Sequence, residues 1–264
     1  MNPPINLAID RSVATLSLTR PETRNALSLP AIDALIAALA MIGANEDVAV
    51  VILESSDDVF CSGHDLKELT AHRTDPDGGL KFFETTFGRC SELMQRIVEL
   101  PQPVIAAIEG VATAAGCQLV ASCDLAVVGA LARFATPGVN IGLFCATPAV
   151  ALTRNVAPKQ AMEMLLSGNL IDADTAARIG LINRVVPRGS ALREARELAD
   201  QLAGKSPAAL RVGKKAVRQQ LMLPLDQAYV LASRTMVESL LGPEAVEGID
   251  AFLMKRPPQW VTSL

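Results

Sequence analysis

The sequence predicts an α/β protein with a C-terminal region that is entirely helical. Short apolar runs, typical of buried strands, alternate with helical patterns up to about residue 187, and only helical patterns follow. This alternation is characteristic of α/β folds. We therefore expect a core over residues 1–188 that holds the binding site, and a helical oligomerisation region over residues 189–264.

The first elements are a hairpin and a helix. Residues 5–9 and 12–18 alternate between apolar and polar side chains and are separated by a polar dipeptide, which predicts two paired strands. Ser28 is a suitable N-cap for the next helix, and Pro30 lies in its first turn. Apolar residues then recur at helical spacing as far as Ile42.

The middle of the chain contains the most apolar segments. Residues 48–53 and 103–108 are continuous apolar runs, which predicts strands buried on both faces. A long amphipathic pattern over residues 81–100 predicts a helix between them. A buried helix over 114–122 and a strand over 125–128 follow.

Helix-capping residues and prolines divide the rest of the chain into short elements. Thr147-Pro148 is a good pair of N-cap and first helical residue, and Asp172 is expected to cap a further short helix. Residues 182–186 form the last strand-like run. Ser206-Pro207 then separates two helical segments.

Composition argues against several functions. The net charge is −4, the pI is about 5.3, aromatic residues make up 3%, and there is no long basic block, so we expect no nucleic-acid partner. No uninterrupted apolar run reaches membrane-spanning length, so we expect no membrane partner. The five cysteines form no CxxC pair and the first twenty residues have no secretory pattern. We therefore expect a reduced, cytoplasmic location and no metal site.

Two strand-to-helix turns are the most informative motifs. Residues 60–66 and 108–119 each follow a buried strand and are rich in small side chains. Such turns leave backbone N–H groups free at a helix N-terminus, where they can bind an anion or a developing oxyanion. Each segment alone could be an ordinary turn packed with small residues. Two in one chain can supply the two donors that a thioester carbonyl needs.

Six segments, in order along nearly the whole chain, resemble landmarks of the crotonase (enoyl-CoA hydratase/isomerase) superfamily. The order and spacing of all six make the resemblance specific. They are Arg20-Pro21 with Arg24 to Leu27, Phe60 to Leu66, Pro103 to Ala107, Cys123 to Ala126, Gly180 to Val186, and Phe252 to Trp260.

The resemblance implies a spiral of ββα turns with C-terminal helices that form a trimer or a dimer of trimers. It implies an acyl-CoA thioester as substrate, with no cofactor beyond the coenzyme A that the substrate carries. It also assigns an oxyanion hole to the backbone N–H groups of His64 and Ala115. Alanine stands at 114 and 115, where most relatives carry glycine. Ala115 can still donate its N–H if its backbone does not need a positive φ.

The two glutamates that hydratases use are missing. The matching positions are Gln118 and Gly138, and no Asp or Glu occurs between Asp124 and Glu163. Glutamine does not transfer a proton at neutral pH, and glycine has no side chain. Each lost acid/base group removes roughly 10²–10⁴ in rate. We therefore expect hydratase activity to be weak or absent.

The resemblance also implies residues that bind the substrate. Arg24 matches a basic residue near the CoA phosphates. Lys255 matches a C-terminal basic residue that contributes from the same or a neighbouring subunit. Either of these side chains could equally be a solvated surface charge. Phe60 and Leu66 are expected to help line the adenine and acyl pocket.

Other polar residues near these motifs have weaker roles. Gln118 and Asn140 could orient a carboxylate or a water molecule through their amides. Asp65 is expected among the substrate-binding residues, and its carboxylate suits a helix N-cap better than a base. The His64 side chain could do acid/base work, although the family uses the backbone at this position.

Together these observations predict an acyl-CoA-binding protein of fatty-acid and acyl-CoA metabolism that stabilises a thioester enolate. Three alternatives stay open: an acyl-CoA decarboxylase or isomerase acting through an enolate, a non-catalytic acyl-CoA binder, and a weak hydratase. A nucleotide-dependent oxidoreductase is disfavoured because no GxGxxG follows the first strand.

Overall fold

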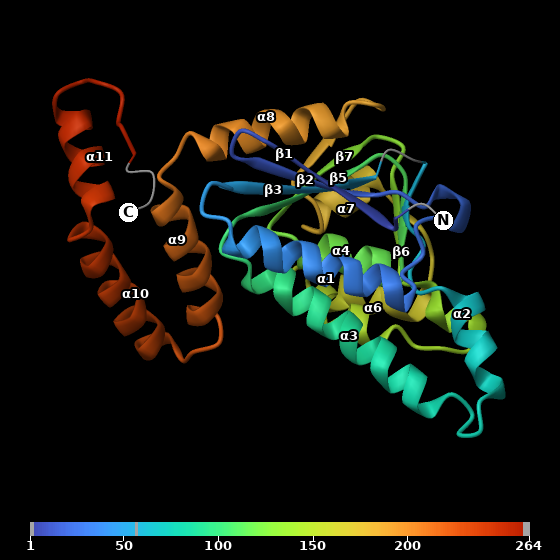
Figure 1. The fold of residues 1–264 in the computed structure, drawn as a ribbon. Coiled ribbons are helices and arrows are strands. Elements are labelled where there is room, and N and C mark those ends of the chain that lie inside the picture. Colours follow the sequence, from blue (N-terminus) through green and yellow to red (C-terminus); the bar gives the residue numbers. More distant parts are fainter. Residues whose placement is uncertain (1–2, 56–57, 261–264) are drawn as a thin grey trace.

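A computed structural model of the chain describes residues 3–55 and 58–260, which form two sheets covered by helices (Figure 1). The large sheet has the strand order β1-β2-β3-β5-β7-β10, and the small sheet has the order β4-β6-β8-β9. The strands of the large sheet are β1 (Ile5–Asp10), β2 (Val13–Leu18), β3 (Val50–Ser55), β5 (Val104–Ile108), β7 (Leu125–Gly129) and β10 (Arg184–Val186). Those of the small sheet are β4 (Val59–Cys61), β6 (Val111–Thr113), β8 (Arg133–Ala135) and β9 (Ile171–Asp172).

The chain winds in repeated strand–strand–helix turns. A strand of the large sheet is followed by a short strand of the small sheet and then by a helix, as in β3–β4–α2 and β5–β6–α4. Neighbouring strands from β2 to β10 are parallel, and so are β4, β6 and β8, while β1 and β9 pair antiparallel with their neighbours. Successive turns therefore stack in register, which is the spiral that the resemblance implies.

The helices surround this core. They are α1 (Leu29–Ala44), α2 (Leu66–Ala71), α3 (Leu80–Glu99), α4 (Ala115–Ser122), α5 (Ala146–Leu152), α6 (Pro158–Ser167), α7 (Ala173–Arg178), α8 (Ala191–Ala203), α9 (Pro207–Gln220), α10 (Leu225–Leu240) and α11 (Pro243–Leu253). Three short 3₁₀ segments are η1 (Pro21–Thr23), η2 (His72–Thr74) and η3 (Pro137–Ile141). No helix in the described part of the chain is both long and apolar enough to cross a bilayer.

The large sheet is buried on both faces, as its continuous apolar strands predict. On β3, Val51 and Leu53 belong to one hydrophobic cluster, and Val50 and Ile52 belong to a second. Helices α1 and α3 contribute to the first cluster and α8 to the second, so the sheet lies between them (Figure 1). The period-2 alternation of a strand thus divides its side chains between two apolar layers.

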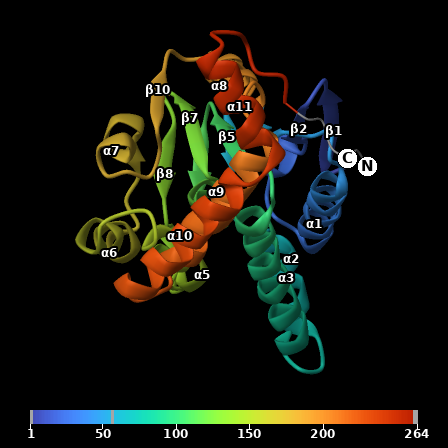
Figure 2. The same ribbon diagram turned by 90° about the vertical axis from the view of Figure 1, so that its left-hand side faces the viewer.

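Helix α8 packs on the sheet, although the sequence assigns it to the separate helical region. It buries Ala191, Ala195, Leu198 and Ala199. The helices that leave the sheet begin with α9, which lies with α10 and α11 to one side of the core (Figures 1 and 2).

Most predicted helix starts agree with the structure. The Ser28 hydroxyl accepts from Ala31 N at 3.4 Å, and the Asp172 carboxylate accepts from Thr175 N at 2.8 Å. The expected cap at Thr147 is wrong. Helix α5 begins at Ala146, because the Cys145 carbonyl already accepts from Ala149 N at 2.9 Å and so the helical turn starts before Thr147.

Candidate functional site

Three strand-to-helix turns meet at one edge of the small sheet. Strands β4, β6 and β8 are parallel neighbours, so their carboxyl ends lie side by side. His64 follows β4, Ala115 follows β6, and Gly138 follows β8. In parallel sheets, ligands bind outside the carboxyl ends of the strands. The fold therefore brings three of the four predicted catalytic positions to one place.

The backbone of His64 is held by a short parallel bridge to Leu27. Leu27 N donates to the Gly63 carbonyl at 2.8 Å, and Asp65 N donates to the Leu27 carbonyl at 3.3 Å. In a parallel bridge of this kind the N–H of the central residue points to the other side. Among the described residues, His64 N has no hydrogen-bond acceptor, and it is therefore free to donate to a ligand.

The backbone N–H of Ala115 is the first of helix α4. It has no acceptor in the part of the chain that the structure describes, as expected for a helix N-terminus. Ala114 is the N-cap and has φ 51° and ψ −118°. This conformation is uncommon for a residue with a side chain. The positive φ thus falls on Ala114, while Ala115 is helical and can donate its N–H.

The two turns touch each other. A Cβ built on Gly63 would lie 2.8 Å from Ala114 Cβ and 3.3 Å from Ala115 N. The Thr113 hydroxyl donates to the Ser62 carbonyl at 3.1 Å and so also joins the two loops. Only a glycine at 63, with φ 95°, allows the loops to approach this closely. The amides that follow Gly63 and Ala114 are therefore near neighbours.

Gln118 lies one turn into α4, on the face that it shares with Ala114 and Ala115. It is 4% exposed, and its Oε1 has no hydrogen-bond partner among the described residues. A buried polar atom without a partner is costly in a folded protein. The amide at this position is thus available to a ligand, but it does not transfer protons at neutral pH.

Gly138 is closed to side chains. A Cβ at this position would lie 2.8 Å from the Leu143 carbonyl oxygen and 2.9 Å from Cys145 Sγ. The sulfur of Cys145 and the chain at Leu143 therefore fill the space into which a side chain from residue 138 would extend. Position 138 therefore lacks a carboxylate, and the packing of the loop also leaves no room for one.

The His64 imidazole is partly buried. Burial lowers its pKa, an effect that the nearby Leu27 carbonyl partly opposes. Its ring packs edge-to-face on Phe87 of α3, with ring centroids 5.0 Å apart. Neither ring nitrogen has a hydrogen-bond partner within the described residues.

A cavity of about 430 Å³ adjoins these turns. Its lining includes the predicted binding residues Arg24 and Asn140, and Ser62 and Thr113 from the two turns. Arg24 is exposed, and its carbonyl accepts from Ser62 N at 3.1 Å, which fixes it beside the His64 turn. The remaining lining residues are Val59, Val111, Ala135, Pro137, Gly168, Asn169 and Leu170. Among the described residues that line the cavity there is no Asp or Glu.

Four predicted binding residues lie outside this cavity. Phe60 is completely buried in the hydrophobic core, so the expectation that it lines the pocket is wrong. The Asp65 carboxylate caps α2, accepting from Lys67 N at 2.9 Å and Glu68 N at 3.2 Å. Leu66 is 51% exposed at the start of α2. Lys255 follows α11, which is far from α2 and α6 within this chain (Figure 1).

Cysteines around the site are inert packing residues. Burial raises the pKa of the Cys61 and Cys117 thiols to about 12, and it also raises the pKa of Cys145. Thiols with such pKa values stay protonated and are poor nucleophiles. Within the described residues no group of His, Cys, Asp and Glu side chains could hold a metal ion.

Comparison with known proteins decides the family. The family model described as enoyl-CoA hydratase/isomerase matches residues 8–263. The chain belongs to the enoyl-CoA hydratase/isomerase family. The crotonase fold expected for this family is confirmed by solved relatives, which superpose over nearly the whole chain.

Two solved structures show how close this family member is to known ones. An enoyl-CoA hydratase of Mycobacterium smegmatis is 44% identical, with a TM-score of 0.93, and the match covers 98% of this chain and 99% of that one. Human enoyl-CoA hydratase domain-containing protein 3 is 41% identical, with a TM-score of 0.92, and the match covers 97% and 100%. The mitochondrial rat protein of the same name is 45% identical over 94% of this chain and 81% of its own length.

The sequence did not predict one part of the cavity lining. Gly168, Asn169 and Leu170 line the cavity, yet the helix before them, α6, is absent from the predicted elements. Its signals are present in the sequence. Pro158 stands at its first position, and Gly168 adopts a left-handed C-cap with φ 65°.

Proposed function

We propose that this protein binds an acyl-CoA thioester and polarises its carbonyl with the backbone N–H groups of His64 and Ala115. The observation that supports the proposal most strongly is the close approach of Gly63 to Ala114 and Ala115. Two further observations support it: among the described residues His64 N and Ala115 N have no acceptor, and the cavity lined by Ser62 and Thr113 has no carboxylate in its lining. Two donors on one oxygen stabilise the enolate that forms when charge moves onto the thioester carbonyl.

Hydration of a double bond needs more than this stabilisation. A base must activate water and an acid must protonate the α-carbon. Gln118 and Gly138 supply neither, and the packing around Gly138 leaves no room for a side chain. With each lost group worth roughly 10²–10⁴ in rate, we propose that true hydratase turnover is weak or absent.

Decarboxylation is the second candidate that the site favours. When a malonyl-type thioester loses CO₂, the electrons of the broken C–C bond enter the thioester as an enolate, and no base is needed to start the reaction. A proton from water then completes the α-carbon. Isomerisation through an enolate and non-catalytic binding of acyl-CoA use the same two amides, and they are distinguished by experiment.

The rest of the substrate is coenzyme A, and the proposal needs no other cofactor. Arg24 is an exposed cation on the rim of the cavity, and no ion pair occupies its guanidinium among the described residues. It is placed to bind the CoA phosphates. Asn140 lies on the same lining and offers its amide to the acyl or pantetheine part.

We also propose that the C-terminal helices assemble the chain into a trimer or a dimer of trimers. Helices α10 and α11 leave large apolar side chains open to solvent, which is typical of an interface. These include Leu225, Val230, Leu241, Phe252 and Leu253, each more than two-thirds exposed. In such an assembly Lys255 would reach the site of a neighbouring subunit.

The metabolic setting follows from the substrate class. We propose a role in acyl-CoA metabolism, including that of fatty acids. The rat relative is named as mitochondrial, whereas the free, buried cysteines of this chain indicate only a reducing compartment.

Three assays test the proposal. Titration with an acyl-CoA analogue in which CH₂ replaces the sulfur should show binding, and no binding would refute it. Crotonyl-CoA hydration should be at least about 10²-fold slower than that of an ordinary family hydratase measured in parallel. A comparable rate would overturn the reading of Gln118 and Gly138. CO₂ release from malonyl-type thioesters separates a decarboxylase from a non-catalytic binder.

The control variant is Gln118→Glu. It restores one proton-transfer group without adding bulk to the loop, so hydration should rise above that of the wild type. Adding Gly138→Glu is a poorer test, because its Cβ would collide with the Leu143 carbonyl and Cys145 Sγ.

A further inference from the structure

Helix α9 connects the core to the C-terminal helices, yet it buries little apolar surface. None of its residues is fully buried, whereas α8 before it buries four. Helices α10 and α11 each bury a single alanine. Apolar packing, the usual force that fixes a helix to a core, is therefore scarce along this part of the chain.

Three basic side chains of α9 contact the core in place of apolar packing. Arg211, Lys214 and Arg218 are three and four residues apart, so they lie on one face of α9. Arg211 Nη2 donates to the Glu46 carbonyl at 3.0 Å, in the loop between α1 and β3. Arg218 Nη2 donates to Asp124 Oδ1 at 2.7 Å. We call these three residues the basic row.

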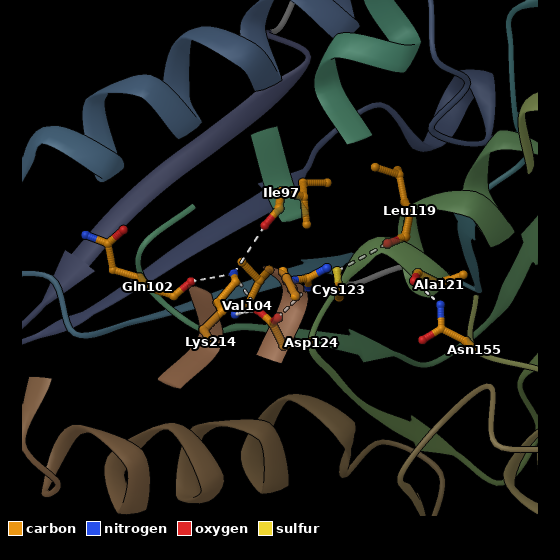
Figure 3. Close-up of polar contacts among 10 residues, drawn as sticks. Ile97, Gln102, Val104, Leu119, Ala121, Cys123, Asp124, Asn155 and Lys214 are labelled. Atoms are coloured by element: carbon orange, nitrogen blue, oxygen red, sulfur yellow. Dashed lines mark hydrogen bonds and ion pairs between the residues drawn. The ribbon is translucent and has the colours of Figure 1, made fainter. Parts of the chain in front are cut away.

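Lys214 is the centre of the basic row. Its side chain is only 8% exposed, and its ammonium group has three acceptors, one for each hydrogen (Figure 3). These are the Ile97 carbonyl at 3.2 Å, the Gln102 carbonyl at 2.9 Å and Asp124 Oδ2 at 2.7 Å. Ile97 is in the last turn of α3, where carbonyls lack helical partners and the helix dipole is negative. All three hydrogens of the ammonium group thus have acceptors in the core.

Asp124 joins the basic row to the sheet and to α4. Its Oδ2 also accepts from Val104 N at 2.8 Å, and its own N–H donates to the Val104 carbonyl at 3.0 Å (Figure 3). It lies two residues beyond the end of α4, the helix that begins with Ala115. The Asp124 carboxylate therefore joins the start of β5 to α9, directly after the end of α4.

We propose that the basic row is an electrostatic dock that fixes α9, and with it α10 and α11, to the core. Because the dock is polar, losing the Lys214 charge releases these three helices as a unit while the sheet stays folded. Removing Lys214 leaves Asp124 with Arg218 as its remaining cation and takes the donor away from the Ile97 and Gln102 carbonyls. Breaking a buried ion pair in this way is destabilising. The inference goes beyond acyl-CoA binding and does not depend on it.

Hydrogen exchange of the full chain, read by mass spectrometry, tests the dock. In Lys214→Met, amides of residues 207–253 should exchange about 10²-fold faster or more, while β3 and β5 keep their protection. The matched control is Lys215→Met, which removes the adjacent, exposed lysine that forms no ion pair among the described residues. It should leave the exchange of residues 207–253 unchanged.

Two results would overturn the proposal. One is equal exchange of residues 207–253 in Lys214→Met and Lys215→Met. The other is that Lys214→Met loses protection in β3 and β5 as well as in the C-terminal helices. The core and these helices would then unfold together, and Lys214 would not hold the helices separately. If Lys214→Met does not fold, Arg218→Gln gives the same test with a smaller expected acceleration, and no acceleration there also contradicts the dock.

Discussion

A single methyl group can break the contact between the turns at Gly63 and Ala114, which form the proposed oxyanion hole. In Gly63→Ala, the new Cβ would lie 2.8 Å from Ala114 Cβ, 3.2 Å from the Thr113 carbonyl oxygen and 3.3 Å from Ala115 N. Residue 63 also has φ 95°, a conformation that alanine rarely adopts. The loops must move apart, and the two amides then no longer converge on one oxygen.

The cost has two parts. Holding alanine at this φ costs about 1–3 kcal/mol, and overpacking the contact costs about 1–3 kcal/mol more. We therefore expect the free energy of unfolding to fall by roughly 2–6 kcal/mol. Each lost hydrogen bond to the thioester carbonyl is worth about 0.5–1.5 kcal/mol, so affinity for a carbonyl-containing acyl-CoA analogue should fall about tenfold or more.

Calorimetric titration with two ligands tests this expectation. The acyl-CoA analogue has an acyl carbonyl and coenzyme A has none. Gly63→Ala should therefore weaken binding of the analogue and leave binding of coenzyme A unchanged. Gly189→Ala is the matched control for backbone strain, because Gly189 has φ 79° and open space around its Cβ position. Equal loss of affinity for both ligands, or unchanged affinity for the analogue, would refute the geometry.

Three further predictions follow from burial and packing. The buried thiols of Cys61, Cys90 and Cys117 keep pKa values of about 12, above the 9.0 of an exposed thiol, so the unfolded chain loses these protons first. Stability is therefore complete below pH 9 and should fall by up to about 1.4 kcal/mol per pH unit for each thiol as the pH rises toward 12. Urea unfolding between pH 8 and 11 measures this, and a flat profile would contradict it. Gly138→Ala should lower the unfolding free energy by about 1–3 kcal/mol, because its Cβ would meet the carbonyl of residue 143 at 2.8 Å; unchanged stability would show that the loop yields freely. His64→Ala keeps the backbone N–H, so analogue affinity should fall less than in the glycine variant above, and an equal or larger fall would assign binding to the imidazole.

Local sequence signals predict much of this fold. The continuous apolar runs at 48–53 and 103–108 correspond to β3 and β5, whose alternate residues enter two separate apolar layers. Caps such as Ser28 and Asp172 act as expected, because an N-cap needs only its own next turn. These elements follow from residues that are close in the sequence.

The short strands of the small sheet are absent from the predicted elements. β4, β6 and β8 have three residues each, too few to show a period, and they are stabilised by each other across 20 or more residues of chain. Pairing over such distances has no local signature. The same sheet positions the three turns of the site, so the geometry of the site also required the structure.

Individual site residues divide in the same way. The small residues in 60–66 and 108–119 predicted two strand-to-helix turns, and the structure has a strand-to-helix turn in each segment. The resemblance, and not the small residues, pointed to His64 and Ala115 within them. The burial of Phe60 and the lack of space for a side chain at Gly138 depend on packing against residues elsewhere in the chain. No local motif in the sequence predicts either feature. Lys214 is the clearest case, because a lysine in a polar helix has no sequence signal for three buried acceptors.

Isotope-edited infrared spectroscopy of a bound acyl-CoA labelled with ¹³C at the thioester carbonyl tests the central claim most directly. Donation from His64 N and Ala115 N should shift the carbonyl stretch to lower frequency than in water, and Gly63→Ala should remove the shift. A carbonyl band unchanged on binding to the wild-type protein would contradict the account, whatever the affinity.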